Sequence, residues 1–468
     1  MRRLVWLAIA SIGAWLSVMA QDVVITLQQG ERPAMAIPDL RGAGDAQNYM
    51  GAFNQTLWAD VEGAGLFKMA PKTMYPTAVP QQPSDFRQPP GPGGSPVERP
   101  PARGRQQITQ PQTGGGLWMS DWSGPPASAN YLAFGYTAVQ NGVFVLRGWL
   151  FDLSRGTPAN AQVVGNTYLG TVDEAGARKV AHDFAADIIA RFGGKTLFGT
   201  HVYFVSNRTG HKEVWVMDPD GKNQRQLTRF NSTSIQPTVS PDGTKIAFTS
   251  YARINPAIFV FSVDPVRDLR FYNQRASVNE TPEFTPDGKQ IVYASSAPND
   301  RCCRIYIANL DGSGLRPITT SSFIDVEPKV NPKTGNEIVF VSGRSGPQQI
   351  YRMNMDGTDV ERLTPGEGEA SNPSWHPDGQ MIAYAWTRGY AQGAFNIFVM
   401  DVASRKQPMQ LTHGEGRNEN PSWAPDGRHL VFMSTRAGSH QIWTMLADGT
   451  QVQPLTTQGS NETPVWGK

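Results

Sequence analysis

Short apolar runs alternate with turn-forming residues along the second half of the chain. Runs such as KIAFTS, QIVYAS and HLVFM each follow the turn sequence Pro-Asp-Gly, and each turn follows a short segment such as PTV or PSW. Proline presets φ at the first turn position and glycine tolerates a positive φ, so each unit predicts a strand, a tight turn and a second strand. Two strands alone cannot bury their apolar faces, so further strands must complete each unit.

The unit recurs along the chain at intervals of about 45 residues. Its copies begin at Pro237, Pro282, Pro328, Pro373, Pro421 and, in truncated form, Pro464. Each copy is accompanied by a second strand pair, as in the run from Glu213 to Thr228, which turns at Asp-Gly. Four strands per repeat of about 40 to 50 residues are typical of a β-propeller, and six copies predict six blades.

The order of the half-repeats predicts how the ring closes. The first second half, around Trp215, precedes the first complete Pro-Asp-Gly unit, whereas Pro464-Val465-Trp466 has no second half after it. We therefore expect the C-terminal strand to return to the blade that contains Trp215. A ring closed in this way removes the free edges that an open repeat array exposes.

The first part of the chain, residues 21–195, has a mixed pattern that predicts a small α/β domain ahead of the propeller at 196–468. Residues 22–27 and 35–38 read as strands, and Asn141-Gly142 between two apolar runs predicts a hairpin. Two apolar stripes at helical spacing predict two helices, the first ending near Gly63 and Gly65 and the second at Gly193-Gly194. The stripes are Tyr49, Phe53, Leu57 and Val61, and Ala177, Val180, Ala181, Phe184, Ile188 and Phe192.

Residues 77–116 interrupt this domain with a Pro/Gly-rich segment. Nine of its residues are Pro and seven are Gly, with few large apolar side chains. Such a composition favours a disordered surface insertion. A Pro-rich ligand for an envelope partner is the functional alternative.

Residues 1–20 have the layout of a secretory signal peptide. Arg2 and Arg3 precede the apolar run Leu4–Leu16, and Ala20 supplies a small residue before Gln21. The apolar run is too short for a typical membrane span, although an uncleaved anchor is the alternative. Cleavage after Ala20 would release a protein with no membrane span.

The overall charge and the potentially reactive residues limit the classes of function that the sequence supports. The chain has 42 basic and 40 acidic residues, so no broad cationic field predicts a nucleic-acid partner. The two cysteines, Cys302 and Cys303, are adjacent and predict a local or free pair rather than a metal site. Ser345 lacks the spacing of a nucleophile elbow, and we expect His182 to be a packing residue without a partner carboxylate. No catalytic residue, cofactor or metal is predicted.

The remaining candidate chemistry is recognition at the mouth of the ring. The residue before each leading proline lies where the chain passes from one blade to the innermost strand of the next, around the central channel. These residues are Gln236, Thr281, Glu327, Asn372, Asn420 and Thr463, preceded in three blades by Glu280, Glu419 and Glu462. Such a ring of polar side chains can bind a peptide, a basic segment or a cation. The alternative is that these groups bind channel water and cap turns.

The recurrent Pro-x-[Trp/Phe/Val]-[Ser/Thr]-Pro-Asp-Gly element resembles the blades of the TolB family, periplasmic propeller proteins of the Tol-Pal cell-envelope system. The first domain is similar to that family in three runs: GAGLFKM from Gly63, WLFDLSRG from Trp149, and RKVAHDFAADIIARFGGKTLFGTHVYFVS from Arg178. With the signal peptide, the resemblance covers nearly the whole chain. The long 77–116 segment departs from it.

The resemblance implies two partner sites. The peptidoglycan-associated lipoprotein Pal docks at the channel mouth in this family, where colicin-type peptides also enter, and the N-terminal tail binds the TolA protein. The implied mouth residues are Asn279, Glu280, Thr281, Asp325 and Glu327, with Asn372, Asn420 and Glu462; the implied tail residues are Gln21, Asp22, Val23, Val24 and Ile25. Val278 stands where the family often has His. The tail can equally be an ordinary first strand of its domain.

The resemblance thus implies a non-catalytic periplasmic scaffold that links TolA to Pal, maintains outer-membrane integrity and supports envelope invagination at cell division. Exchange between partners would depend on whether the tail is free or packed. The alternative is a propeller lyase or sugar-binding protein that uses the channel and a bound metal. A peptidase accessory domain is disfavoured, because the chain is expected to close its own ring.

Overall fold

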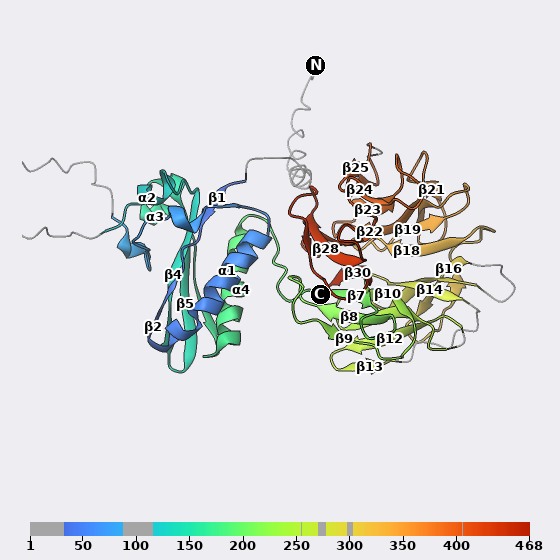
Figure 1. Cartoon of the computed structure of the whole chain (residues 1–468), viewed down its shortest axis with the longest axis horizontal. Helices are drawn as coiled ribbons and strands as arrows, with labels where there is room; N and C mark the ends of the chain where they lie inside the picture. The colour runs from blue at the N-terminus through green and yellow to red at the C-terminus, as the bar shows by residue number, and fades with distance from the viewer. Residues whose placement is uncertain (1–31, 88–115, 254, 270–277, 297–302, 405) are drawn as a thin grey trace, which may run out of the picture. The chain divides into compact units, whose positions relative to one another are not determined.

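The computed structural model describes residues 32–87, 116–253, 255–269, 278–296, 303–404 and 406–468. These residues form two compact units, Arg32–His201 and Val202–Gly467. The first unit combines a sheet with helices, and the second consists of strands (Figure 1). The predicted signal peptide and the predicted strand at 22–27 lie outside the described residues.

The N-terminal unit is built on a mixed sheet in the order β3-β1-β4-β5-β6, with β2 also paired to β4. Strand β1 runs parallel to β3 and β4, whereas β4, β5 and β6 are antiparallel neighbours. The strands are β1 (Ala34–Ala36), β2 (Arg41–Ala43), β3 (Lys68–Met69), β4 (Tyr131–Gln140), β5 (Val143–Asp152) and β6 (Gln162–Gly170). Asn141 and Gly142 both have positive φ, 51° and 74°, so the predicted hairpin between β4 and β5 is confirmed.

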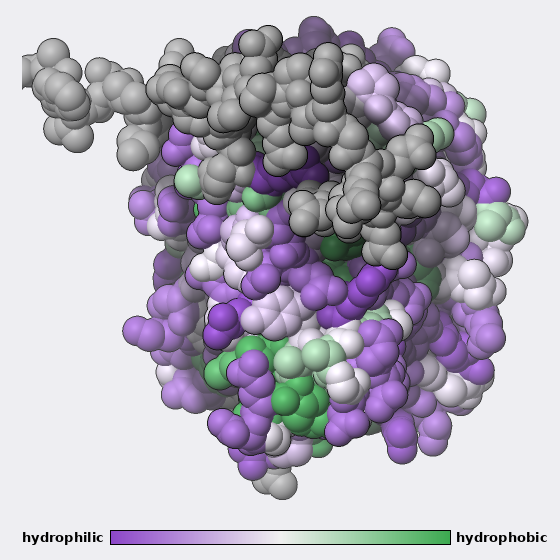
Figure 2. Space-filling view, turned by 90° about the vertical axis from the view of Figure 1, so that its left-hand side faces the viewer, coloured by the Kyte–Doolittle hydropathy of each residue, from purple (hydrophilic) through white to green (hydrophobic). Residues whose placement is uncertain are grey.

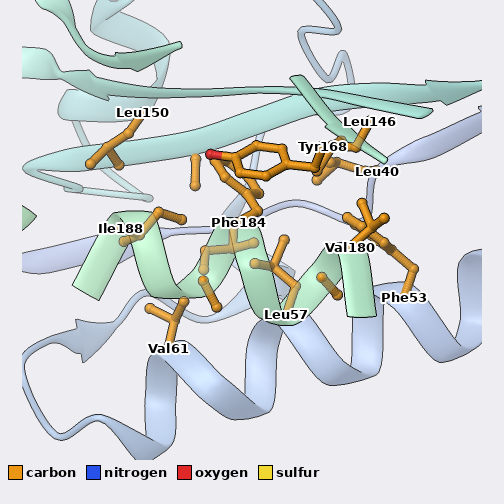
Figure 3. Close-up of a cluster of buried hydrophobic side chains, with 14 of the residues drawn as sticks. Leu40, Phe53, Leu57, Val61, Leu146, Leu150, Tyr168, Val180, Phe184 and Ile188 are labelled. Atoms are coloured by element: carbon orange, nitrogen blue, oxygen red, sulfur yellow. The ribbon is translucent and has the colours of Figure 1, made fainter. Parts of the chain in front are cut away.

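Two long helices pack against one face of this sheet, as their apolar stripes predict. They are α1 (Met50–Gly63) and α4 (Glu174–Arg191), and α4 begins where the Asp173 carboxylate accepts the N–H of Gly176 at 2.6 Å. Phe53, Leu57 and Phe184 are fully buried between the helices and the sheet (Figure 3). Burying such side chains stabilises the unit by about 1.5–3 kcal/mol each.

A second apolar cluster covers the other face of the sheet near β1. It includes a residue of the segment that was predicted to be a disordered insertion. Trp122 is fully buried and Phe86 is 4% exposed in this cluster, beside Phe134 and Phe151 of the sheet. The prediction that all of 77–116 forms a disordered surface insertion is therefore wrong for residues 77–87, which pack through Phe86. Residues 88–115 lie outside the described residues. The short helices here are α2 (Ser120–Ser123) and α3 (Pro158–Ala161).

The second unit is a propeller of six four-stranded sheets, which confirms the predicted fold. Five sheets follow the chain in order, from the innermost to the outermost strand. They are β10 (Ser234–Val239), β11 (Lys245–Ser250), β12 (Ala257–Val263) and β13 (Val266–Asp268); β14 (Asn279–Phe284), β15 (Gln290–Ser295), β16 (Arg304–Asn309) and β17 (Arg316–Pro317); β18 (Asp325–Val330), β19 (Glu337–Ser342), β20 (Gln349–Asn354) and β21 (Glu361–Arg362); β22 (Ala370–Trp375), β23 (Met381–Trp386), β24 (Asn396–Asp401) and β25 (Met409–Gln410); and β26 (Asn418–Trp423), β27 (His429–Ser434), β28 (Gln441–Leu446) and β29 (Gln453–Pro454).

The sixth sheet joins distant parts of the chain. Its order is β30-β7-β8-β9, in which β30 (Asn461–Gly467) lies beside β7 (His201–Ser206), followed by β8 (Glu213–Met217) and β9 (Arg225–Gln226). The structure thus confirms that the C-terminal strand completes the blade of Trp215. Among the described residues, no helix is both long enough and apolar enough to span a membrane.

Candidate binding site at the mouth of the channel

Each innermost strand contains one residue with a left-handed backbone, directly before its leading proline. Its φ lies between 45° and 55° in all six blades. The residues are Gln236, Thr281, Glu327, Asn372, Asn420 and Thr463. In the five blades from β10 to β29 this residue lies at a register shift between the first two strands. Such strain in non-glycine residues is uncommon and tends to cluster at functional sites.

Five of these six residues are joined by hydrogen bonds into a belt around the channel. The backbone N–H of Thr281 donates to Gln236 Oε1 at 3.3 Å, and that of Glu327 donates to Thr281 Oγ1 at 3.2 Å. The N–H of Asn372 donates to Glu327 Oε2 at 2.6 Å, and that of Asn420 donates to Asn372 Oδ1 at 3.3 Å. Each bond spans two neighbouring blades, so the left-handed residues tie the blades together.

The belt is interrupted at Thr463. Its Oγ1 atom is buried and has no hydrogen-bond partner among the described residues. A pocket of about 450 Å³ lies at this interruption, lined by Gln236, Asn420 and Thr463 together with residues of the surrounding loops. Its size falls within the range of ligand pockets in proteins.

The pocket walls carry paired charges and apolar groups. Lys212 pairs with Glu462, and Arg417 pairs with Glu419 at 2.7 Å. Tyr251 lines the same pocket with 43% of its surface exposed. The pocket can therefore contact both polar and apolar groups of a partner.

Three channel carboxyl groups have raised pKa values because of burial. They are Glu280, Glu327 and Glu419. For Glu327, the N–H of Asn372 and the charge of Lys329 offset only part of the burial effect on the pKa. The charge of Glu462 adds to the rise in the pKa of Glu419. Protonation of these groups would change the charge of the channel.

The predicted mouth residues divide into two groups in the structure. Glu280, Thr281, Glu327, Asn372, Asn420 and Glu462 lie along the innermost strands. Asn279 and Asp325 are the first residues of the innermost strands β14 and β18, but their side chains are buried, 2% and 0% exposed. Partner contact through any of these residues stays a prediction.

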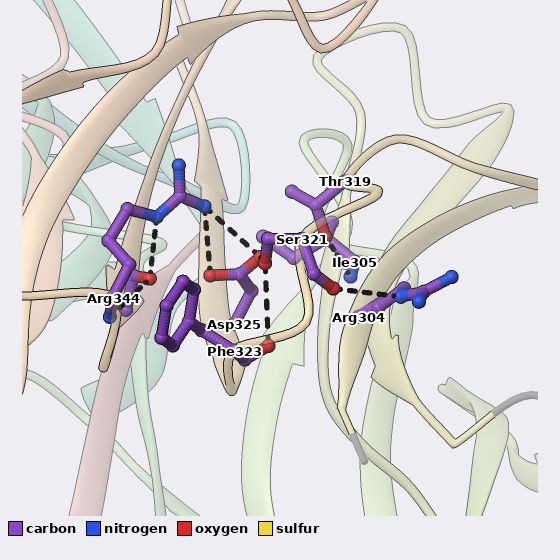
Figure 4. A network of polar contacts seen from close by, with 8 residues as sticks. Arg304, Ile305, Thr319, Ser321, Phe323, Asp325 and Arg344 are labelled. Atoms are coloured by element: carbon purple, nitrogen blue, oxygen red, sulfur yellow. Dashed lines mark hydrogen bonds and ion pairs between the residues drawn. The ribbon is translucent and has the colours of Figure 1, made fainter. Parts of the chain in front are cut away.

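The buried Asp325 belongs to a polar network within its blade. Its carboxylate accepts hydrogen bonds from Arg344 at 3.0 and 3.2 Å and from Ser321 Oγ at 2.6 Å (Figure 4). In the same way, Asn279 accepts a bond from Ser295 Oγ at 2.8 Å. Asp325 thus fixes the loop that leads into β18, and Asn279 ties β14 to β15.

A recurrent arginine, which the sequence reasoning missed, donates a hydrogen bond to the first residue of the innermost strand in other blades as well. Arg208 donates to Asn461 at 3.2 Å and Arg436 donates to Asn418 at 3.1 Å. Each guanidinium also lies over aromatic rings, 4.5 Å from the ring centre of Trp215 and 5.1 Å from that of Trp443. The repeated spacing Ser-x-Arg at Ser206, Ser342 and Ser434 is the signal that could have revealed it.

The expectation that His182 has no partner carboxylate is wrong. Its Nδ1 contacts Asp60 Oδ2 at 2.5 Å, because α4 packs against α1, and its ring stacks on Phe198 at 3.9 Å. Among the described residues, no group of three or more His, Cys, Asp or Glu side chains is placed to hold a metal ion. The predicted tail residues, Gln21 to Ile25, and Cys302 lie outside the described part of the chain, whereas Cys303 is disulfide-bonded.

Comparison with known proteins agrees with this architecture. The family model described as the TolB beta propeller domain matches residues 191–391 and 367–468. A protein TolB homolog of Chlorobium luteolum is 35% identical over 202 residues, which are 43% of this chain and 44% of that protein. The Tol-Pal system protein TolB of Bordetella pertussis is 32% identical over 248 residues, 51% of this chain and 53% of that protein.

The matches to these curated relatives span about half of their length. The crystal structure of TolB from Acinetobacter baumannii superimposes with a TM-score of 0.72 and 20% identity, covering 94% of this chain and 97% of that one. This likeness shows a shared fold. Because the family model covers more than half of the sequence, the chain belongs to the TolB β-propeller family.

Proposed function

We propose that this chain is a non-catalytic periplasmic scaffold of the Tol-Pal system, which binds Pal at the channel mouth and TolA through residues 21–25. In this role it helps to maintain outer-membrane integrity and supports envelope invagination during cell division. The pocket at the interrupted belt, in a propeller of the TolB family, is the observation that carries the proposal.

The pocket suits a segment of a protein partner. Tyr251 offers an exposed aromatic ring, the kind of side chain that often dominates binding energy at interfaces. Lys212 and Arg417 already pair with Glu462 and Glu419, so an incoming charged group exchanges partners instead of meeting an unpaired charge. The belt fixes Gln236 and Asn420 in the pocket wall before binding, which lowers the ordering cost of association.

Calorimetric titration of residues 21–468 with the periplasmic domain of Pal from the same organism tests the mouth site. We expect Tyr251→Ala to weaken binding about tenfold, or about 1.4 kcal/mol. Leu315→Ala is the matched control. Leu315 is 47% exposed, but it lies near the turn from β16 to β17, at the end of its blade that faces away from the mouth. Absence of Pal binding, or equal loss in both variants, would refute the mouth site.

The tail site is tested separately. Deleting residues 21–27 should abolish capture of TolA in a pull-down while leaving Pal affinity unchanged, and a variant with these residues in scrambled order controls for tail length. Unaltered TolA capture by the deletion variant contradicts the tail proposal. Turnover of oligogalacturonate in the presence of manganese would contradict the non-catalytic role.

A further inference from the structure

The last strand of the N-terminal sheet, β6, has one edge with which no described strand pairs. It pairs with β5 on one side only and ends the strand order of the sheet. Its nine residues, QVVGNTYLG, include no charged residue and no proline. A long uncharged edge presents a row of backbone N–H and C=O groups that can pair with another strand.

The other described sheet edges of this chain are protected. The outermost propeller strands have only two or three residues each, and β2 and β3 are equally short. The innermost propeller strands are longer, but each carries a proline and a residue with positive φ. Among the described sheet edges, β6 is therefore the long strand that has neither a proline nor a residue with positive φ outside glycine.

The side chains along β6 define what an added strand would meet. On the α4 side, Asn166 and the Tyr168 hydroxyl both donate to Asp187 Oδ2 at 2.7 Å. Asp187 forms no ion pair with any described residue, whereas Asp183, one turn earlier on α4, pairs with Lys179. Burial and then the hydrogen bond to Asp187 raise the pKa of Tyr168, so its hydroxyl keeps the proton that it donates to the Asp187 carboxylate.

The opposite face of β6 is apolar at its end. Leu169 is 57% exposed, the largest exposed fraction among the large hydrophobic side chains of the described residues. Figure 2 looks onto the N-terminal unit and shows a hydrophobic area bordered by hydrophilic residues on its lower part. Successive residues of a strand face opposite sides, so an added strand would place alternate side chains beside Asp187 and beside Leu169.

We infer that β6 accepts an extended segment of a protein partner as an added strand, with Lys or Arg on the side of Asp187 and apolar residues beside Leu169. Main-chain hydrogen bonds along the edge supply affinity, and the alternating side chains supply specificity. Neighbouring strands lie about 4.8 Å apart, so a lysine or arginine side chain on the added strand reaches Asp187. Pairing with β6 of a second copy is disfavoured, because it brings two uncompensated Asp187 carboxylates to one edge.

The test uses residues 21–468 and a fluorescein-labelled ten-residue peptide that alternates lysine and valine, followed by fluorescence anisotropy. We expect Asp187→Asn and Leu169→Lys each to weaken binding about tenfold. The matched controls are Asp220→Asn, on an exposed propeller turn, and Leu315→Lys, which changes a comparably exposed leucine. Both controls should keep the dissociation constant within about twofold.

Two control peptides separate strand addition from simple charge attraction. A peptide with glutamate in place of lysine should bind at least about tenfold more weakly, and so should a lysine peptide with alternate amides methylated. Hydrogen exchange of the complex should slow at residues 162–170. If Asp187→Asn fails to fold, Leu169→Lys still tests the inference, because the Leu169 side chain is exposed and its replacement should not disturb folding.

Three results would overturn the inference. They are equal binding of the methylated peptide, an unchanged dissociation constant for Leu169→Lys, and slowed exchange outside the N-terminal sheet. A dimer in sedimentation that Leu169→Lys dissociates would assign the edge to a second copy instead. Pal and TolA binding at the mouth and the tail are independent of all these outcomes.

Discussion

Removing the Trp466 side chain tests whether the returning strand β30 holds the propeller together. Trp466 is 6% exposed, and its backbone N–H donates to Ser422 Oγ of the preceding blade at 3.0 Å. The substitution Trp466→Ala leaves the backbone pairing in place but empties a large buried volume. Such truncations cost about 3–5 kcal/mol, since the surroundings collapse only in part.

This loss of unfolding free energy is measurable by scanning calorimetry on residues 21–468. One kcal/mol shifts the melting temperature of a unit of this size by about 2 °C, so we expect the propeller transition to fall by about 6–10 °C. Trp118→Ala is the control, because Trp118 is 44% exposed and belongs to the N-terminal unit. It should leave the propeller transition where it is.

A propeller transition that moves by less than about 2 °C in Trp466→Ala would refute the reasoning. In that case β30 would contribute little to the ring, and the blades from β10 to β29 would account for its stability. A similar fall in both transitions would instead indicate that the two units unfold together.

Three further predictions concern buried groups. Asp325→Ala leaves Arg344 without its carboxylate and should lower the unfolding free energy by about 3 kcal/mol in urea, with part of the loss recovered by adding Arg344→Leu. Phe184→Ala, at a fully buried site, should cost about 3–5 kcal/mol and lower only the transition of the N-terminal unit. The folded pKa of Glu327 is raised by burial, so its contribution to stability is present below its ordinary value of 4.5 and is lost as pH rises through the folded pKa. Glu327→Gln should therefore flatten the fall in melting temperature as the pH rises above 4.5, and an unchanged pH profile would contradict this.

The repeat made the propeller predictable from the sequence, because strand, turn and strand are local patterns. The same holds for α1, α4 and the hairpin at Asn141, whose signals span only a few residues. The position of the truncated copy at Pro464 was enough to predict the closure of the ring.

The contacts between repeats were not predictable in this way. The belt joins residues of neighbouring blades, and its interruption at Thr463 depends on side-chain geometry that no single repeat encodes. Asp325 and Asn279 lie only two residues from the left-handed positions, yet they point into the blade. Asp60 meets His182 because two helices pack together, which their separate apolar stripes do not specify.

The pairing of β30 with β7 also constrains how the molecule reaches its native state. Arg208 and its partner Asn461 are 253 residues apart, so the first blade cannot be completed until nearly the whole propeller has been synthesised. Until then the hydrophobic strand HVYFVS lacks its inner neighbour and is exposed to association with other nascent chains. Long-range closure of this kind is slow, and we expect refolding yield to fall as protein concentration rises.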